Sequence, residues 1–401
     1  MTGPALDALV DATLPDGRRV DVTLRDGRIE AIVDRGQPDS TPAQPGRHAI
    51  DCGGALLLSA FVDGHCHLDK TFWGAPWQPH VASGSLRERI AHERDLRARI
   101  GVPVALRATA LAEHMVSLGT GHVRSHVDID PDVKLDGLHQ LLEVRESLRD
   151  KLSIQLVAFP QSGVVTAPGV PDLLDAALSE GADLIGGLDP AGFDGDVDGQ
   201  LDVVFGLAER HGAGIDIHLH DGGELGTRQL HAIAERTKSL GLAGKVTVSH
   251  AYCLGPVDKA AVDRTATALA AAGVSLMTNG PAGTMPPVLR LREHGVLVFA
   301  GSDNIRDAWW SYGTGDMLER ATIIGLEGGL MTDDELGYAA SLVTDSAAAA
   351  LGLADYGVHP GNRADLVVIA AANPAEAVAG HPERLLVLHD GRVVRPADHL
   401  S

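Results

Sequence analysis

Two histidines that lie two residues apart, His65 and His67, follow an apolar stretch of the chain. Side chains in a β-strand alternate between its two faces, so these two imidazoles point the same way and can bind one ion together. Cys66 points away from them, and we interpret it as a small buried hydrophobic residue. The alternative is that both histidines are solvated at the surface, because a single His-x-His pair is common by chance.

Two later sites supply donor atoms of the same kind. His218 and His220 share one face of a predicted strand, so one of them could be a third ligand and the other could contact substrate. Asp303 follows another apolar stretch and offers an oxygen ligand. Taken singly, either histidine could be a core residue bonded to a carboxylate, and Asp303 could cap a helix. Together they predict a site for one divalent metal ion, either zinc or iron or another late first-row ion.

These residues need a scaffold that brings distant parts of the chain to one place. Short apolar stretches alternate with helical patterns, which indicates parallel strands joined by helices. The predicted strands span residues 56–62, 122–127, 154–159, 183–188, 214–219, 245–249, 274–278 and 296–300. Eight such units predict an α/β protein with a (β/α)8 TIM-like barrel. The alternative is a doubly wound open sheet, but the sequence lacks the glycine fingerprint that usually follows its first strand.

The polar residues occur where such a barrel requires them. Active-site side chains of a (β/α)8 barrel come from the carboxyl ends of its strands. Nearly every predicted strand here runs apolar and then ends in a polar cluster. His65 and His67 follow the first strand, Gln161 the third, and His250 the sixth. We therefore expect all of these side chains to meet at one mouth of the barrel.

The two ends of the chain follow a different pattern. Asp16-Gly17 and Asp26-Gly27 are hairpin dipeptides between alternating apolar residues, and Asp390-Gly391 repeats the pattern near the other end. Two such segments can combine into one sheet structure. We expect a small β-sandwich domain built from residues 1–58 and 356–401, beside a barrel domain over residues 59–355.

Composition narrows the classes of partner. The formal net charge of -21 repels phosphate backbones and anionic lipids, so neither nucleic acid nor a membrane is an expected partner. The chain has no apolar run of eighteen residues, and its first residues lack the features of a secretion signal. Three cysteines without zinc-ribbon spacing are typical of a reducing cytoplasm. These features predict a cytoplasmic enzyme that acts on a small molecule, and they leave a homo-oligomer open.

Six segments together resemble the amidohydrolase superfamily and, within it, the cytosine deaminase-like branch. The segments are FVDGHCHLDKTF, VRSHVDID, QLVAFPQSG, IDIHLHDGGELG, VTVSHAYC and GSDNIRDAWW, and the similarity covers almost the whole chain. Within that branch the chain looks most like a member that degrades s-triazines. The resemblance implies that His65, His67, His218 and Asp303 bind the metal ion. It also implies that His250 lies beside the metal-bound water.

The resemblance further implies that Lys70, Gln161 and Asn304 face the substrate. We add three candidate substrate contacts from the same segments: His220, Asp221 and Trp309. Two residues depart from cytosine deaminases proper. Asp221 stands where they carry a glutamate proton shuttle, and Asn304 stands where they carry an aspartate. Both differences argue against cytosine as the substrate. Two of these residues also have a purely structural interpretation: Lys70 could be a surface lysine, and Gln161 could cap a loop.

These residues predict a metal-dependent amidohydrolase or deaminase. Hydroxide would attack a ring carbon of a small N-heterocycle such as a pyrimidine or s-triazine, and ammonia or an alkylamine would leave. Asp303 and His250 would handle protons, and Lys70 would polarise the ring. Ring-opening hydrolysis of a cyclic amide is one alternative, but binuclear relatives carry a carboxylated lysine on the fourth strand, and residues 183–188 contain no lysine. A non-catalytic scaffold is the other alternative. Such a protein should have lost some of the metal ligands, whereas all four candidates and His250 are present in this sequence.

Overall fold

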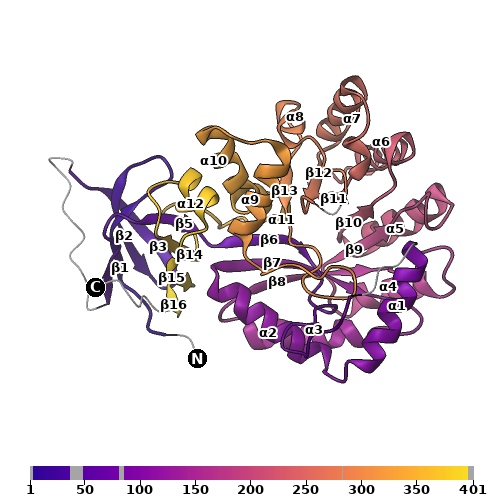
Figure 1. The fold of residues 1–401 in the computed structure, drawn as a ribbon, viewed down its shortest axis with the longest axis horizontal. Helices are drawn as coiled ribbons and strands as arrows, with labels where there is room; N and C mark the ends of the chain where they lie inside the picture. The colour runs from indigo at the N-terminus through magenta and orange to yellow at the C-terminus, as the bar shows by residue number, and fades with distance from the viewer. Residues whose placement is uncertain (1–2, 37–47, 81–84, 282, 396–401) are drawn as a thin grey trace.

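The computed structural model describes residues 3–36, 48–80, 85–281 and 283–395. Parts of the predicted terminal domain, namely residues 1–2, 37–47 and 396–401, lie outside the described residues. Two sheets organise the chain, a parallel barrel and a smaller sheet that lies beside it (Figure 1). In the described part of the chain, no helix is both long and apolar enough to cross a lipid bilayer.

The barrel consists of eight parallel strands in chain order. They are β6 (Phe61–Cys66), β7 (Thr120–Asp128), β8 (Ser153–Phe159), β9 (Leu184–Leu188), β10 (Gly214–Leu219), β11 (Val246–His250), β12 (Val274–Thr278) and β13 (Val298–Ala300). A parallel bridge between Cys66 and Asp303 links the last strand back to the first, and the Asp303 amide donates to the His65 carbonyl at 2.7 Å. The predicted (β/α)8 barrel is confirmed, and its closure places Asp303 next to His65.

The predicted first strand, residues 56–62, is wrong because two strands share that apolar run. β5 (Leu56–Ser59) pairs with β14 (Leu366–Ile369) in the smaller sheet, whereas β6 begins at Phe61 and extends to Cys66. Between them, the Ala60 amide donates to the Asp365 carbonyl at 2.8 Å. All residues from Leu56 to Cys66 are buried, so no exposed polar residue marks the boundary between the two sheets.

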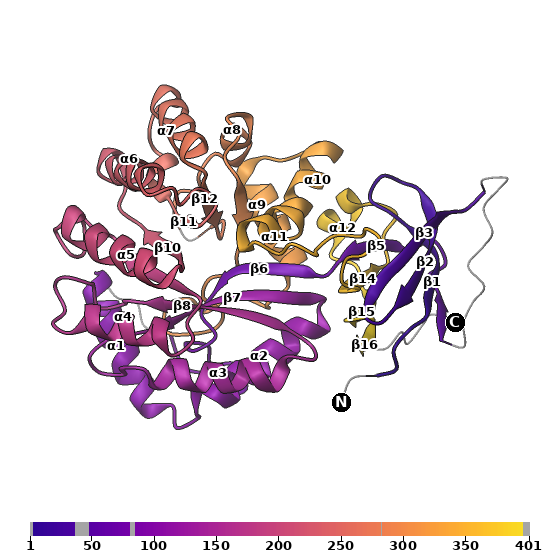
Figure 2. The ribbon, with the colours of Figure 1, turned by 180° about the vertical axis from the view of Figure 1, so that it is seen from behind.

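Helices cover the outside of the barrel (Figure 2). The connections after β6 to β9 contain α1 (Leu86–Arg99) and α2 (Val104–Ser117), α3 (Asp136–Leu148), α4 (Val170–Ser179) and α5 (Val197–His211). Those after β10 to β13 contain α6 (Gly223–Ser239), η1 (Tyr252–Leu254), α7 (Lys259–Ala272), α8 (Val288–Glu293), α9 (Met317–Gly328), α10 (Asp333–Leu342) and α11 (Asp345–Leu351). α12 (Pro374–Gly380) packs on α9 and α10. The apolar faces of these helices and strands form the main hydrophobic core.

Both ends of the chain build the smaller sheet. Its order is β16-β15-β14-β5-β1-β2-β3, with β4 paired to β1. The remaining strands are β1 (Ala8–Thr13), β2 (Arg19–Arg25), β3 (Arg28–Asp34), β4 (Ala49–Asp51), β15 (Arg384–His389) and β16 (Arg392–Arg395). Apolar residues from both ends, among them Leu9, Val22, Leu366 and Leu388, share one core. The prediction that the two termini form one small β structure is confirmed.

A buried charged cluster joins this sheet to the start of β7. Asp365 lies just before β14, and its carboxylate oxygens lie 3.3 Å from His122 Nε2 and 3.2 Å from His389 Nδ1. Arg363 Nε approaches the same carboxylate at 3.1 Å. The ion pair with Arg363 and the contacts with the two imidazoles thus link the small sheet to the amino-terminal end of β7, opposite His126 and Asp128.

Candidate active site

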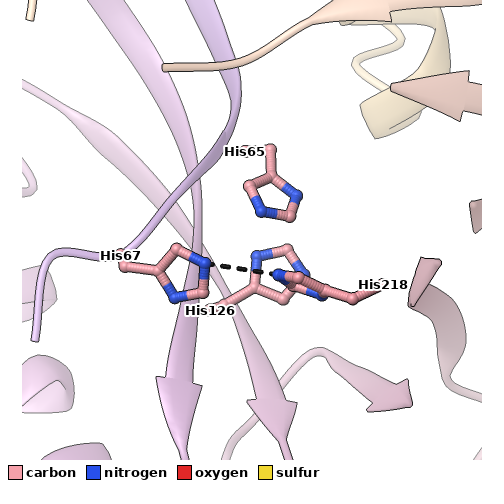
Figure 3. A group of neighbouring side chains, drawn as sticks. All are labelled: His65, His67, His126 and His218. Carbon is pink, nitrogen blue, oxygen red and sulfur yellow. Dashed lines mark hydrogen bonds between the residues drawn. The ribbon is translucent and has the colours of Figure 1, made fainter. Parts of the chain in front are cut away.

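The four predicted metal ligands converge at the carboxyl ends of β6, β10 and β13. His67 Nε2 lies 3.3 Å from His218 Nε2 and 3.4 Å from Asp303 Oδ1, and His65 Nε2 lies 3.6 Å from Asp303 Oδ1. Every pair among these four residues has donor atoms within 4.8 Å. Figure 3 shows the three imidazoles turned toward one another, with His126 beside them. Cys66 packs into the hydrophobic core, as the facing argument predicts.

The residues present fit a divalent cation. His65 Nε2 is buried without a hydrogen-bond partner, although it faces the other donors. Burial lowers the pKa of His67 to about 3 and holds that of His218 well below its ordinary value, so both rings are neutral. Burial alone would raise the pKa of Asp303, but the neighbouring imidazoles outweigh it and keep the carboxylate ionised. Three imidazole nitrogens and one anionic oxygen form a typical zinc ligand set.

A hydrogen-bonded chain behind the site orients His65. Its Nδ1 lies 2.9 Å from Ser249 Oγ, and Ser249 Oγ donates to Asp216 Oδ1 at 2.6 Å. Asp216 also lies 3.2 Å from Arg124 and 3.6 Å from His126 Nε2. Partners of this kind fix the ring orientation of a metal-binding histidine and leave its other nitrogen free for the ion.

The backbone is strained at three of the strand ends that form the site. Asp189 has φ 35°, His250 has φ 73° and Asp303 has φ 60°, values that residues with a Cβ rarely adopt. Each follows or ends a barrel strand, namely β9, β11 and β13. Such conformations cluster at functional sites, where the surrounding structure holds them in place.

Tyr252 and Asn279 connect His250 to Asp303. Asn279 Nδ2 donates to Asp303 Oδ2 at 2.8 Å, which leaves Oδ1 facing the histidines. The Tyr252 hydroxyl lies 3.2 Å from Asn279 Oδ1 and 3.3 Å from His250 Nδ1. His250 Nε2 is buried without a hydrogen-bond partner. The network therefore orients the carboxylate and one imidazole from the side away from the metal ligands.

A cavity of about 330 Å³ opens above these residues. His67, His218 and Asp303 line it, and so do five of the predicted substrate contacts: Lys70, Gln161, His220, Asn304 and Trp309. His220 Nδ1 lies 2.8 Å from Asp189 Oδ2, and its ring stacks on His250 with a centroid separation of 4.6 Å. Burial would lower the pKa of His220, but Asp189 outweighs it and raises that pKa.

Residues 48–395 match the amidohydrolase family. The chain belongs to this family. It is a hydrolase that acts on carbon–nitrogen bonds other than peptide bonds. N-isopropylammelide isopropyl amidohydrolase of Pseudomonas sp. (strain ADP) is 33% identical over 355 residues, which cover 86% of this chain and 87% of the relative.

Two crystal structures show the same architecture as this amidohydrolase. N-isopropylammelide isopropylaminohydrolase from Burkholderia multivorans ATCC 17616 has a TM-score of 0.92 at 41% identity, with 100% of both chains covered. 5-Methylcytosine deaminase from Klebsiella pneumoniae, liganded with phosphonocytosine, has a TM-score of 0.87 at 29% identity, with 97% of this chain and 98% of that chain covered. The resemblance to the cytosine deaminase-like branch is confirmed.

Asp221 lies apart from the other candidate contacts of the amidohydrolase. Its Oδ2 accepts hydrogen bonds from the Gly192 amide and Gln229 Nε2, both at 2.8 Å. It does not occur among the described residues that line the cavity. The carboxylate therefore joins the loop after β9 to α6, and nothing in this geometry supports its predicted place at the substrate.

Sequence reasoning missed several residues that complete the site. Phe159 ends β8 and stacks on His218 with a centroid separation of 4.1 Å. Asn279 and Tyr252 follow β12 and β11, so the rule that polar residues follow barrel strands could have identified them. Glu93 lies within α1, a helix without a clear apolar stripe, and its carboxylate contacts Lys70 and Trp309. No local signal in the sequence indicates that contact.

Proposed function

We propose that this amidohydrolase uses one zinc ion to hydrolyse an exocyclic carbon–nitrogen bond of a small N-heterocycle, such as an s-triazine or a pyrimidine. Ammonia or an alkylamine is the leaving group. One observation carries the proposal: His65, His67, His218 and Asp303 bring their donor atoms together beside a cavity that Lys70 also lines. We further propose a cytoplasmic location, because the three cysteines are free and buried.

The donor set favours a single ion. His65, His67, His218 and Asp303 would hold it, and a zinc ion in such a site lowers the pKa of a bound water to about 7. A second ion in related enzymes needs a carboxylated lysine on the strand that corresponds to β9. The residues of β9, Leu184–Leu188, include no lysine.

Asp303 and His250 move the protons of the reaction. Asp303 Oδ2 accepts a hydrogen bond from Asn279, so Oδ1 is the oxygen that would face the ion and accept a proton from the attacking water. The Tyr252 hydroxyl donates to Asn279 Oδ1, and it can then only accept from His250 Nδ1. This tautomer leaves His250 Nε2 as an acceptor beside the attacking water, and Asp303 returns the proton to the departing nitrogen.

The cavity suits a flat ring with a lactam edge. The side-chain amides of Gln161 and Asn304, which each contain a donor and an acceptor, line the cavity together with the Lys70 cation. Trp309 and Phe159 supply aromatic walls. His220 completes the polar lining next to His250. The named relatives make N-isopropylammelide and 5-methylcytosine the first two compounds to test.

Metal analysis and a turnover screen test this function. The purified protein should contain one equivalent of zinc, and it should release an amine or ammonia from at least one amino-substituted triazine or pyrimidine. Ammonia and isopropylamine are detected separately, and the ring product is identified by mass. A ring-opened product would instead support cyclic amide hydrolysis. Bound metal below one-tenth of an equivalent, together with no turnover of any heterocycle, would support a scaffold.

A further inference from the structure

The ammonium of Lys70 is surrounded by three oxygen atoms. Gln161 Oε1 lies at 2.5 Å, Asp128 Oδ1 at 3.0 Å and Glu93 Oε2 at 3.3 Å from Nζ. An ammonium has three N–H donors, so these oxygens account for all of them. Asp128 and Glu93 are buried carboxylates, whereas Gln161 lines the cavity. Only the donor that now faces Gln161 is therefore within reach of a substrate.

Glu93 connects that ammonium to a wall of the cavity. Its Oε2 also accepts a hydrogen bond from Trp309 Nε1 at 2.8 Å, and Trp309 lines the cavity. Glu93 lies on α1, which also contributes Leu86 and Arg89 to the lining. One carboxylate oxygen thus joins three elements: the segment after β6, α1 and the loop after β13.

We infer that Glu93 is a positioning residue, which fixes Lys70 and Trp309 so that one Lys70 N–H points at the substrate. This inference rests on the proposed function. It also limits the substrate to a ring that offers a hydrogen-bond acceptor, such as an oxo oxygen or an unprotonated ring nitrogen, in place of Gln161 Oε1. Glu93 acts through two other residues and does not itself touch the substrate.

The charge of Glu93 matters as well as its shape. The Lys70 side chain is only 2% exposed, so its cation depends on nearby anions. Burial would raise the pKa of Glu93, but Lys70 and Arg97 outweigh it and lower that pKa, so the group is a carboxylate. A neutral amide of the same shape can still accept from Trp309, but it binds the ammonium more weakly.

The first test is kinetic and uses Glu93→Gln with the heterocycle that the wild type turns over. The expected result is a fall in kcat of about 10- to 100-fold with KM within about threefold, because the lost interaction acts through Lys70 in the transition state. Trp309→Phe keeps the Lys70–Glu93 pair and should instead raise KM. Asp95→Asn, an exposed change of the same type on α1, is the matched control and should leave both constants unchanged. Glu93→Gln with wild-type kcat would overturn the inference.

The second test needs no substrate. In a spectrum of ¹⁵N-labelled tryptophan indoles, the signal lost in Trp309→Phe identifies Trp309. That signal should move upfield in Glu93→Gln, because the acceptor is no longer charged, and stay in place in Asp95→Asn. If Glu93→Gln alone fails to fold, the double variant Lys70→Met with Glu93→Gln removes both charges and should show the same shift. An unmoved indole signal would overturn the contact, whereas no turnover by the wild type would count only against the proposed function.

Discussion

Strand β7 carries a histidine near each end, and the two residues have different surroundings. His122, near the start, has its Nε2 3.3 Å from the carboxylate of Asp365. His126, near the carboxyl end, packs among other imidazoles, with its ring centroid 4.0 Å from that of His65. Both ring nitrogens of His126 lack a hydrogen-bond partner, and burial lowers its pKa to about 4.

The difference shows how one strand can serve stability and chemistry at once. At the small-sheet end, the Asp365 carboxylate lies within 3.3 Å of an arginine and two histidines, and these contacts link the two sheets. At the mouth, three imidazoles and the Asp303 carboxylate bring their donor atoms within 4.8 Å of one another. Such a cluster is favourable only when a cation completes it. Substitutions at the two ends should therefore separate activity from stability.

The largest effect is expected from Asp303→Asn at the mouth. This change removes the anionic ligand and the oxygen that accepts the proton of water, so turnover should fall by about a thousandfold or more. The fold should persist, because the Asp303 side chain is 13% exposed and belongs to the cavity rather than the core. Turnover of ammonia or amine and the circular dichroism melting curve are the measurements. Activity within tenfold of the wild type would remove Asp303 from the mechanism.

At the other end of β7, Asp365→Asn should lower stability and leave activity largely unchanged. The amide removes the buried anion beside His122 and Arg363, although Arg363 keeps its pair with Asp390, so the free energy of unfolding should fall by about 3 kcal/mol. Zinc content and kcat should stay within twofold of the wild type. Urea unfolding followed by fluorescence measures the loss. Asp355→Asn is the control, since its 44% exposed carboxylate pairs with Arg28 at the surface and should contribute under about 1 kcal/mol.

The pH dependence of stability tests whether the charge of Asp365 stabilises the small-sheet end of β7. Burial would raise the pKa of Asp365, but His122, His389 and Arg363 outweigh it and lower that pKa to about 2. Because the folded pKa lies below the ordinary value of 3.8, the contribution of this carboxylate is complete above about pH 4 and is lost as the pH falls toward 2. The gap in unfolding free energy between wild type and Asp365→Asn should narrow by about 1 kcal/mol from pH 7 to pH 3. A constant gap would mean that packing, and not charge, accounts for the Asp365 effect.

The sequence was sufficient for the barrel and for the convergence of the candidate metal ligands. Side chains alternate between the two faces of a barrel strand, and active-site residues follow the carboxyl ends of the strands. Apolar runs that end in histidine or aspartate therefore indicate both the strands and the residues at the mouth of the barrel. The resemblance then selected His218 over His220, which the facing argument alone left open. His220 instead lies beside His250 and bonds to Asp189.

What the sequence did not predict depends on contacts between distant segments. Glu93 accepts a hydrogen bond from Trp309, which lies 216 positions later in the chain. The sequence of α1 shows no pattern that would predict this contact. Asp221 follows two histidines that line the cavity. Its carboxylate, however, accepts a hydrogen bond from the Gly192 amide in the preceding loop and does not line the cavity. The boundary between β5 and β6 could not be predicted either. The apolar run that contains both strands is continuous in the sequence, although its residues are buried in two different hydrophobic cores.

The smallest expected effect tests the chain behind His65. Ser249→Ala removes the hydroxyl between His65 Nδ1 and Asp216 Oδ1, so the ring loses the partner that orients it. Zinc affinity, measured by competition with a chelator, should fall about tenfold, while kcat at saturating zinc stays within about threefold. Ser275→Ala on β12 removes another buried hydroxyl and should leave affinity unchanged. Equal affinities in both variants would mean that packing against His126 and its neighbours, and not the hydrogen bond to Ser249, holds the ring.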